Sequence, residues 1–261
     1  MDRKIKPNTV KEKIRKLEPI ICAFMRIPDP SVAEIMALSG VELIVIDYEH
    51  YQFNPETLVN IIRAADIYGV SCLIRVTGVD HGQICRYLDM GAVGVFLADA
   101  ENSEQIKKVV DAVKYYPAGH RGVSTDSRGS RFSSVTNIGH HTEFFNANTI
   151  IAVVIETKSA VDDLDQILAI PEIDILSVGS ADLSLAYGLT ENSDQSKLLR
   201  LKHSIYKRII SSGKMALDKA ATFKEARKAY DMGIRCFYIT SDSVLLIETL
   251  DRIISPIKSV F

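Results

Sequence analysis

The run IIAVVIE, residues 150–156, shows most clearly the pattern from which the fold is predicted. It is apolar without interruption until its last residue, which is a glutamate. A short, continuous apolar run is typical of a strand that is covered on both faces, as in a parallel sheet. Seven other runs share this character: IICAFMRI (20–27), LIVID (43–47), CLIRV (72–76), VGVFLA (93–98), DILSVG (174–179), KMALD (214–218) and CFYIT (236–240).

Amphipathic stretches with helical periodicity separate these runs. One of them, residues 55–68, opens with a proline and is followed by Gly69, as is typical of a helix. Eight strand–helix units in roughly 250 residues predict an α/β protein with a single (β/α)8 TIM barrel. An open doubly wound sheet is the alternative, but it usually carries a GxGxxG turn after its first strand, and this chain has none. We assign residues 20–261 to the barrel and residues 1–19 to a charged N-terminal arm or helix.

The composition is ordinary for a globular protein and narrows the choice of partners. With 31 basic and 33 acidic residues and a net charge of −2, the chain has no overall field that favours nucleic acid or a membrane surface. No apolar run approaches the ~20 residues of a membrane span, and the charged N-terminus is unlike a signal peptide. We therefore expect a cytoplasmic protein. Its four cysteines form no CxxC pair, which predicts reduced thiols: Cys22, Cys72, Cys85 and Cys236.

Two carboxylates follow neighbouring strands at the barrel end where active sites are built. Glu156 ends the run at 150–156, and Asp182 follows the run at 174–179. Converging carboxylates repel each other unless a proton or a cation lies between them. Their oxygens suit Mg²⁺ or Mn²⁺, with water and substrate at the remaining positions. The pair therefore indicates a metal site; the alternative is one structural carboxylate beside one helix cap.

His50 and Arg75 are further candidates at strand ends. His50 follows its strand directly, and because histidine ordinarily titrates near neutrality it suits a general base, with Asp47 or another nearby carboxylate orienting its ring. Its alternative role is to close the turn. An interior arginine must be paired, either with a protein carboxylate or with an anionic substrate or developing oxyanion. For four other strand-end residues, helix capping is the competing interpretation: Asp99, Asp218, Ser241 and Asp242.

Five segments, in order and with their spacing, resemble the HpcH/HpaI family of metal-dependent 4-hydroxy-2-oxoheptane-1,7-dioate aldolases and their relatives. The resemblance runs from about residue 20 to 255, and as a set the motifs are specific. The segments are DYEHYQFNPETL (47–58), IRVTGVDHGQICRYLDMGAVGVFLADAENSEQ (74–105), YYPAGHRGV (115–123), IETKSAVDDLDQIL (155–168) and GSADLSLAYG (179–188).

The resemblance implies a class II aldolase that joins or separates pyruvate, as its enolate, and an aldehyde, acting on a 4-hydroxy-2-oxo acid in aromatic or sugar-acid catabolism. It implies that Glu156 and Asp182 bind Mg²⁺ or Mn²⁺, with Co²⁺ or Zn²⁺ as other options. It also implies that His50 works with Asp89 as the base and that Arg75 contacts the keto oxygen. No Schiff-base lysine is needed, and none of the predicted strands ends in one. Backbone N–H groups in one segment would hold the pyruvate carboxylate: Gly179, Ser180, Ala181 and Asp182.

The chain departs from the family pattern around the metal ligands rather than at them. Val154 stands where the family often has Gln, and Ser180 where its motif has Pro. Ala98 replaces a usual Pro, and Asp99 follows it where relatives often carry an apolar residue. These changes bear on substrate range. They leave two alternatives open: an acyl-CoA lyase of the citrate-lyase β-subunit and malyl-CoA lyase type, or a catalytically weak barrel that binds a 2-keto acid.

Two segments outside the motifs also carry expectations. The irregular stretch at 117–148 is rich in Arg and Ser, and we expect it to lie over the barrel mouth, where it would contact a carboxylate or phosphate of the aldehyde. A solvated loop is the alternative. In the family a neighbouring subunit completes the pocket and the C-terminal helix is exchanged. The apolar run VLLIETLDRIISPIKSVF (244–261) suits such packing, so the resemblance implies a homo-oligomer, a trimer or hexamer.

Overall fold

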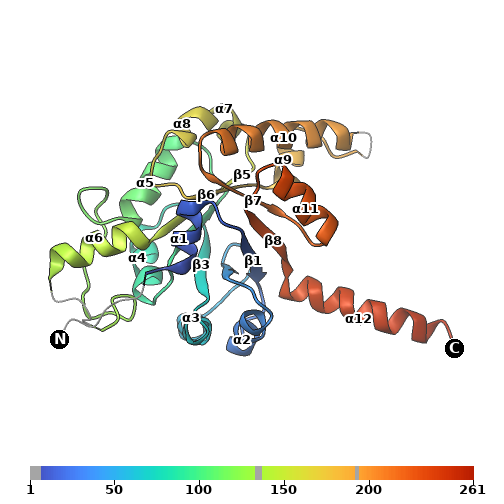
Figure 1. The fold of residues 1–261 in the computed structure, drawn as a ribbon, viewed down its shortest axis with the longest axis horizontal. Coiled ribbons are helices and arrows are strands. Elements are labelled where there is room, and N and C mark those ends of the chain that lie inside the picture. Colours follow the sequence, from blue (N-terminus) through green and yellow to red (C-terminus); the bar gives the residue numbers. More distant parts are fainter. Residues whose placement is uncertain (1–6, 133–136, 192–193) are drawn as a thin grey trace.

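The computed structural model of the protein describes residues 7–132, 137–191 and 194–261. Eight parallel strands close into a barrel in which each strand pairs with its neighbours in sequence and β8 pairs with β1 (Figure 1). The predicted (β/α)8 barrel is therefore confirmed. The strands are β1 (Ile20–Met25), β2 (Leu43–Asp47), β3 (Ser71–Thr77), β4 (Gly94–Ala98), β5 (Ile150–Ile155), β6 (Ile175–Val178), β7 (Met215–Lys219) and β8 (Cys236–Ser241).

After each of the first seven strands, helices return the chain along the outside of the barrel, so all strands end on one face (Figure 1). Their starts follow the sequence signals: the Asn54 side chain accepts a 2.7 Å hydrogen bond from the backbone N–H of Thr57, and Pro55 begins α3. The helices are α1 (Thr9–Lys16), α2 (Pro30–Leu38), α3 (Pro55–Ile67), α4 (His81–Asp89), α5 (Ser103–Val113), α6 (Ile138–Asn148), α7 (Lys158–Asp162), α8 (Leu164–Leu168), α9 (Ser180–Ala186), α10 (Gln195–Ser211), α11 (Phe223–Asp231) and α12 (Asp242–Lys258).

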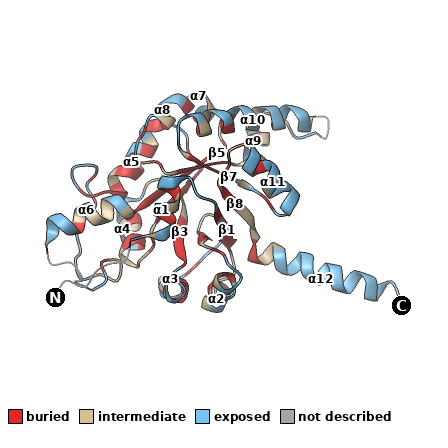
Figure 2. Cartoon of the chain, viewed as in Figure 1, coloured by how far each residue is buried: buried red, intermediate tan, exposed pale blue. Residues whose placement is uncertain are grey.

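Side chains alternate between the barrel interior and the layer beneath the helices. In β4, Phe96 packs inside with Phe24 and Val45, whereas Val95 and Leu97 belong to the outer cluster. Figure 2 shows the strands as largely buried and the outer helix faces as exposed. Because the interior is packed, only the last inward-facing residue of each strand can reach the mouth.

Helix α1 closes the N-terminal end of the barrel. Val10 and Ile14 are buried in the same cluster as the first interior residues of the strands. Lys11 Nζ lies 2.6 Å from Asp174 Oδ1 and 2.9 Å from the backbone oxygen of Thr149. This part of the predicted N-terminal arm is thus docked on the barrel, and residues 1–6 lie outside the described residues.

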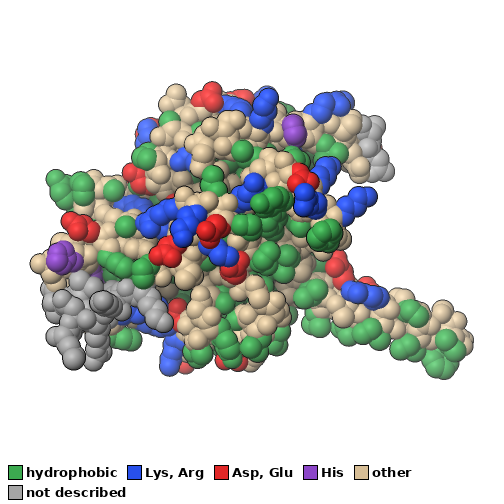
Figure 3. Space-filling model, in the orientation of Figure 1, with side chains coloured by type: hydrophobic (Ala, Val, Ile, Leu, Met, Phe, Trp, Pro, Cys, Tyr) green, Lys and Arg blue, Asp and Glu red, His purple; other side chains and the backbone are tan. Residues whose placement is uncertain are grey.

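Helix α12 extends away from the barrel, as Figure 1 shows, and Figure 3 shows hydrophobic side chains along its length. Its exposed apolar residues include Leu246, Ile247, Leu250, Ile253 and Ile257. Although this helix is apolar, no helix in the described ranges is long and apolar enough to cross a bilayer.

The predicted long loop lies at the opposite end of the barrel from the mouth. Its first part, residues 117–132, packs against the end of α4, where Arg121 Nη2 lies 2.8 Å from Asp89 Oδ1. Its last part is helix α6, and residues 133–136 between them lie outside the described residues. The expectation that this stretch covers the mouth is wrong, because α5 returns the chain to the N-terminal end of the barrel before the stretch begins.

Candidate active site

Charged residues from four strand ends meet at the barrel mouth. Asp47, at the end of β2, is fully buried and pairs with two arginines. Arg26 Nε lies 3.2 Å from Asp47 Oδ2, and Arg75 Nη1 lies 3.5 Å from Asp47 Oδ1. Glu156, directly after β5, is close enough for the charge of Arg75 to lower the pKa of its carboxyl. The charged residues Arg26, Asp47, Arg75 and Glu156 therefore gather at one site.

Glu156 is buried and held in one orientation. It is 4% exposed, and its Oε1 accepts a 2.6 Å hydrogen bond from the backbone N–H of Asp99. Asp99 has a left-handed φ of 51°, which Asp tolerates better than most non-glycine residues. On the other side, a Cβ at Gly179 would lie 2.2 Å from Glu156 Oε2. Glycine is therefore required at 179 for the carboxylate to occupy this position.

Asp182 acts electrostatically on Glu156 from the first turn of α9, where its side chain is exposed. Burial raises the pKa of Glu156, the Asp99 N–H and Arg75 lower it, and the charges of Asp182 and Glu49 raise it again. A buried carboxylate with carboxylate neighbours is a place that a divalent cation would stabilise. The structure thus places the two predicted ligands within electrostatic range of each other at the mouth.

Glu49 links Arg75 to His50 in the turn after β2. Arg75 Nη2 lies 2.5 Å from Glu49 Oε2, and His50 Nε2 lies 3.5 Å from the same oxygen. Burial raises the pKa of Glu49, and the charges of Arg75 and His50 lower it. The His50 side chain is 57% exposed. Arg75 Nε is buried and has no hydrogen-bond partner among the described residues, so this N–H is available to a substrate.

The loop from β6 into α9 presents backbone N–H groups to the mouth. Gly179 is the N-cap of α9, and its own N–H donates a 3.1 Å hydrogen bond to Ile155. The first-turn N–H groups have no partner within the helix. In the part of the chain that the structure describes, they make no other hydrogen bond either: Ser180, Ala181 and Asp182. Three of the four predicted N–H donors are therefore free.

Asp89 does not meet His50 within one chain. It ends α4, which runs from the mouth back to the N-terminal end of the barrel. Its carboxylate pairs with Arg121 at 2.8 Å, and no hydrogen bond or ion pair joins it to His50 over the described residues. Inside one subunit, the carboxylate beside His50 is Glu49.

None of the four other strand-end residues caps a helix through its side chain as the capping interpretation predicted. Ser241 is the N-cap position of α12, although its side chain makes no capping bond. Asp99 instead aims its N–H at the site, and Asp218 pairs with Lys202 at 3.3 Å. The Asp242 carboxylate accepts hydrogen bonds from the backbone N–H groups that follow β1, at 2.9 to 3.1 Å.

Two residues at the mouth had no assigned role from the sequence. Glu49 lies in the same turn as His50, and its pairing with Arg75 becomes visible only once β2 and β3 are adjacent. Lys219 is the last residue of β7, which extends one residue beyond the predicted run. The expectation that no strand ends in a lysine is therefore wrong. The alternation of Met215, Leu217 and Lys219 was the signal that could have revealed it.

The donor set fits a hard divalent cation. Over the described ranges, no group of three or more His, Cys, Asp and Glu side chains is arranged to hold a metal ion. Glu156 and Asp182 supply two carboxylates, which leaves positions for water and for a chelating substrate. A closed structural zinc site would require four protein ligands.

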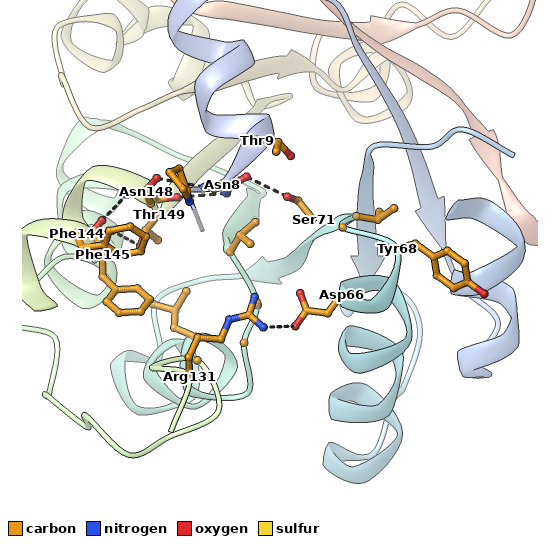
Figure 4. Close-up of a pocket in the computed structure, with 18 of the residues that line it drawn as sticks. Asn8, Thr9, Asp66, Tyr68, Ser71, Arg131, Phe144, Phe145, Asn148 and Thr149 are labelled. Carbon is orange, nitrogen blue, oxygen red and sulfur yellow. Dashed lines mark hydrogen bonds and ion pairs between the residues drawn. The ribbon is translucent and has the colours of Figure 1, made fainter. Parts of the chain in front are cut away.

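A cavity of about 700 Å³ lies away from this site, at the N-terminal end of the barrel (Figure 4). Several of its polar groups bond to one another, whereas the buried Arg121 Nε has no hydrogen-bond partner among the described residues. The Asn8 Oδ1 accepts a 3.0 Å hydrogen bond from Ser71, the Asn8 side-chain N–H donates to Asn148 at 3.3 Å, and Arg131 lies 3.1 Å from Asp66. These pairs join the start of α1 to β3 and α6, and the loop residue Arg131 to α3.

The comparisons with known proteins identify a family. A family model described as HpcH/HpaI aldolase/citrate lyase matches residues 21–247. A 2-keto-3-deoxy-L-rhamnonate aldolase of Escherichia coli O9:H4 (strain HS) is 30% identical over 253 residues, which are 97% of this chain and 94% of that protein. A protein of the same name from Salmonella typhi is 30% identical over 254 residues, with the same coverage.

Solved structures share the fold over nearly the whole chain. The crystal structure of citrate synthase SbnG has a TM-score of 0.86 and 26% identity, and covers 96% of this chain and 97% of that one. An HpcH/HpaI aldolase from Desulfitobacterium hafniense DCB-2 has a TM-score of 0.88 and 24% identity, with 95% and 96% covered, and so supports the fold alone. The predicted resemblance is confirmed, and the chain belongs to the HpcH/HpaI aldolase/citrate lyase family as an enzyme of the carbon–carbon lyase class.

Proposed function

We propose that this protein is a divalent-metal-dependent aldolase that makes or cleaves the bond between pyruvate, as its enolate, and an aldehyde. In the cleavage direction its substrate is a 4-hydroxy-2-oxo acid. The observation that carries the proposal is the buried Glu156 carboxylate, which the Asp99 N–H holds beside Asp182 and near Arg75. Relatives named as aldolases support the same reaction class.

Glu156 and Asp182 would hold the cation, with Mg²⁺ or Mn²⁺ as the first candidates and Co²⁺ or Zn²⁺ as others. When bound, the cation polarises the keto group of pyruvate and makes its methyl protons more acidic. The free N–H groups at the start of α9 bind the pyruvate carboxylate. This contact orients the keto oxygen toward Arg75.

Arg75 and His50 carry out the polar chemistry at the reacting carbon. The unpaired Arg75 Nε–H donates to the keto oxygen, where negative charge develops as the methyl proton leaves. Because Glu49 and Asp47 anchor the guanidinium, its position is set before substrate binds. His50 accepts the proton, directly or through a water molecule, and the neighbouring Glu49 stabilises its protonated ring.

We assign Asp89 to the site of a neighbouring subunit. Its own barrel keeps it far from His50, because α4 carries it to the N-terminal end. A role beside His50 therefore requires a homo-oligomer, a trimer or hexamer, in which Asp89 of one subunit faces the mouth of the next. The exposed apolar residues of α12 support an interface in which this helix is exchanged between subunits.

Proton–deuterium exchange into the methyl group of pyruvate, followed by NMR with Mg²⁺, Mn²⁺ or EDTA, tests the proposal without knowledge of the aldehyde. Exchange that requires metal and stops with EDTA supports enolate formation. No exchange with any metal would contradict it. The acyl-CoA lyase would then be tested by acetyl-CoA formation from candidate thioesters, and the weak 2-keto-acid binder by pyruvate titration.

The variant His50→Ala tests the assignment of the base. We expect methyl exchange to slow about 100-fold, because a positioned proton acceptor is lost, while Mn²⁺ binding measured by calorimetry stays unchanged. His203→Ala, an exposed histidine on α10, is the matched control. Unchanged exchange in His50→Ala would remove this residue from the base.

A further inference from the structure

The identity of the aldehyde is the part of the proposed function that the family leaves open. Two similar proteins carry names for different substrates, a 2-keto-3-deoxy-L-rhamnonate aldolase and a citrate synthase. The charge of the acceptor must therefore be sought in this chain's own residues at the mouth. Lys219, at the end of β7, has a positive charge that bears on the charge of the acceptor.

The alternation of β7 points Lys219 into the barrel. Met215 and Leu217 belong to the interior cluster, whereas Ala216 belongs to the outer one. Asp218 faces outward, where it pairs with Lys202 on α10. Two residues after Leu217, Lys219 therefore has the inward direction again.

The neighbouring strands place Lys219 next to the metal-binding side of the mouth. On one side it is paired with Tyr238 of β8, whose ring packs edge-on against Phe24 with centroids 4.7 Å apart. On the other side, Leu217 is paired with Ser177, so continuation of the register brings Lys219 level with Gly179. Neighbouring strands lie about 4.8 Å apart, and the four-carbon stem of a lysine can span this gap and extend over the site.

The Lys219 ammonium is exposed and has no hydrogen-bond or ion-pair partner within the described ranges. The two arginines of the mouth differ in this respect, because Arg26 pairs with Asp47, and Arg75 pairs with both Asp47 and Glu49. An unpaired cation beside a substrate site attracts an anionic group and pairs with it once water is displaced. The pyruvate carboxylate already has the N–H groups of α9, so this cation faces the other half of the substrate.

We propose that Lys219 determines specificity by binding an anionic group, a carboxylate or phosphate, on the aldehyde half of the substrate. The inference rests on the proposed aldolase function and names its acceptor class as acidic aldehydes. Lys219 acts here as a charge partner and forms no bond to carbon.

The test measures kcat/KM for aldol addition of pyruvate to three anionic aldehydes and one neutral one. The anionic aldehydes are glyoxylate, succinic semialdehyde and glyceraldehyde 3-phosphate, which distinguish carboxylate from phosphate, and the neutral one is glycolaldehyde. The variants are Lys219→Met, which keeps the length, and Lys219→Arg, which keeps the charge. Lys228→Met, an exposed lysine in the last turn of α11, is the control.

We expect the wild type to prefer an anionic aldehyde and Lys219→Met to lose about 10- to 100-fold in kcat/KM on it, as for removal of a charge-assisted hydrogen bond. Glycolaldehyde addition and pyruvate methyl exchange should change little, and Lys219→Arg should keep most of the preference. An equal loss on all aldehydes, or a wild type that prefers glycolaldehyde, would overturn the proposal.

Two further outcomes separate this inference from the function on which it rests. Absence of methyl exchange in the wild type would refute the aldolase itself, and the role of Lys219 would fall with it. Trapping of pyruvate on Lys219 by borohydride reduction, seen by mass spectrometry, would instead give this lysine a covalent role and contradict the proposal. Normal exchange together with an unchanged aldehyde preference in Lys219→Met would refute only the role of Lys219.

Discussion

Buried charged groups have different partners at the two ends of the barrel. At the N-terminal end, Lys11 binds both Asp174 and the backbone oxygen of Thr149. Nearby, Lys114 Nζ donates to the backbone oxygens of Asn146 and Thr149 at 2.8 and 3.0 Å. Both buried ammonium groups at this end, which α1 closes, have oxygen acceptors, although the Nε–H of the buried Arg121 there has no hydrogen-bond partner among the described residues.

At the mouth the matching is incomplete. Burial raises the pKa of both Glu49 and Glu156, so neither carboxylate is fully compensated by its neighbours. Arg75 Nε has no hydrogen-bond partner, and the Lys219 ammonium no ion-pair partner, within the described part of the chain. The two ends therefore differ in their carboxylates: Asp174 at the N-terminal end is paired with Lys11, whereas Glu49 and Glu156 at the mouth, the reactive end, lie beside other carboxylates whose charge a cation would compensate.

Glu156→Ala should have the largest effect, because it removes a predicted ligand at the reactive end. We expect Mn²⁺ affinity to fall by more than about 100-fold and pyruvate exchange to be lost with it, since even residues that only orient metal ligands contribute 10- to 100-fold. Calorimetry and NMR measure the two quantities. Asp165→Ala, at an exposed carboxylate on α8, is the control. A variant that kept both properties would refute the ligand assignment.

Asp174→Ala should have the next largest effect, on stability rather than activity. It leaves the buried Lys11 without its charge partner and the Ile151 N–H without an acceptor. We expect the free energy of unfolding, measured in urea, to fall by about 3 kcal/mol. Glu156→Gln, which removes a buried charge at the mouth, should change it by less than about 1 kcal/mol or increase it. Equal losses of unfolding free energy in Asp174→Ala and Glu156→Gln would contradict the difference between the two ends of the barrel.

The sequence predicted the barrel and most of the mouth for the same reason. Strands buried on both faces are continuous apolar runs, and the residue that ends such a run is held at the mouth by the fold itself. Glu156, Arg75 and His50 were therefore located from strand ends alone, and Asp182 from the first turn after one. Which of these residues lie near one another follows from the order of the strands around the barrel.

The features that were not predicted depend on where an element ends or which way it runs. Strand β7 ends at Lys219, one residue past Asp218, where the apolar pattern predicted its end. Asp89 matches a family motif, but the direction of α4 separates it from His50 in one chain. The stretch at 117–148 follows β4 in sequence, which predicted a place at the mouth, but α5 returns the chain to the other end of the barrel before the stretch begins.

Substitutions at Asp99 change backbone strain at the mouth and leave the N-terminal end of the barrel unaltered. Asp99→Gly keeps the left-handed φ of 51° and the N–H that binds Glu156, so Mn²⁺ affinity should be nearly unchanged. Asp99→Val disfavours that φ by about 1–2 kcal/mol, which should displace the N–H and weaken Mn²⁺ binding roughly tenfold. Calorimetric titration of both variants measures this. Similar affinities would show that the backbone N–H does not orient the carboxylate.

The smallest expected effect is on the pH dependence of stability, and it arises from Lys114 at the closed end of the barrel. Burial lowers the pKa of Lys114 from 10.5 to about 8, so between these values the unfolded chain binds more protons at this group than the folded one. Stability contributed by Lys114 should therefore rise as pH increases from about 8 to 10.5.

Lys114→Met removes this contribution, and Lys108→Met, at an exposed position of α5, is the control. Between pH 8 and pH 10, the free energy of unfolding of the wild type should increase relative to that of Lys114→Met by on the order of 1 kcal/mol per pH unit, as for a single titrating group. Urea titrations at both pH values give the slopes. The absolute stability of Lys114→Met also falls, because two carbonyl acceptors lose their donor, so only the slope is diagnostic. Parallel slopes in the wild type and Lys114→Met would mean that the bonds to the two carbonyls keep Lys114 charged, and that the closed end matches its charges more completely than its burial suggests.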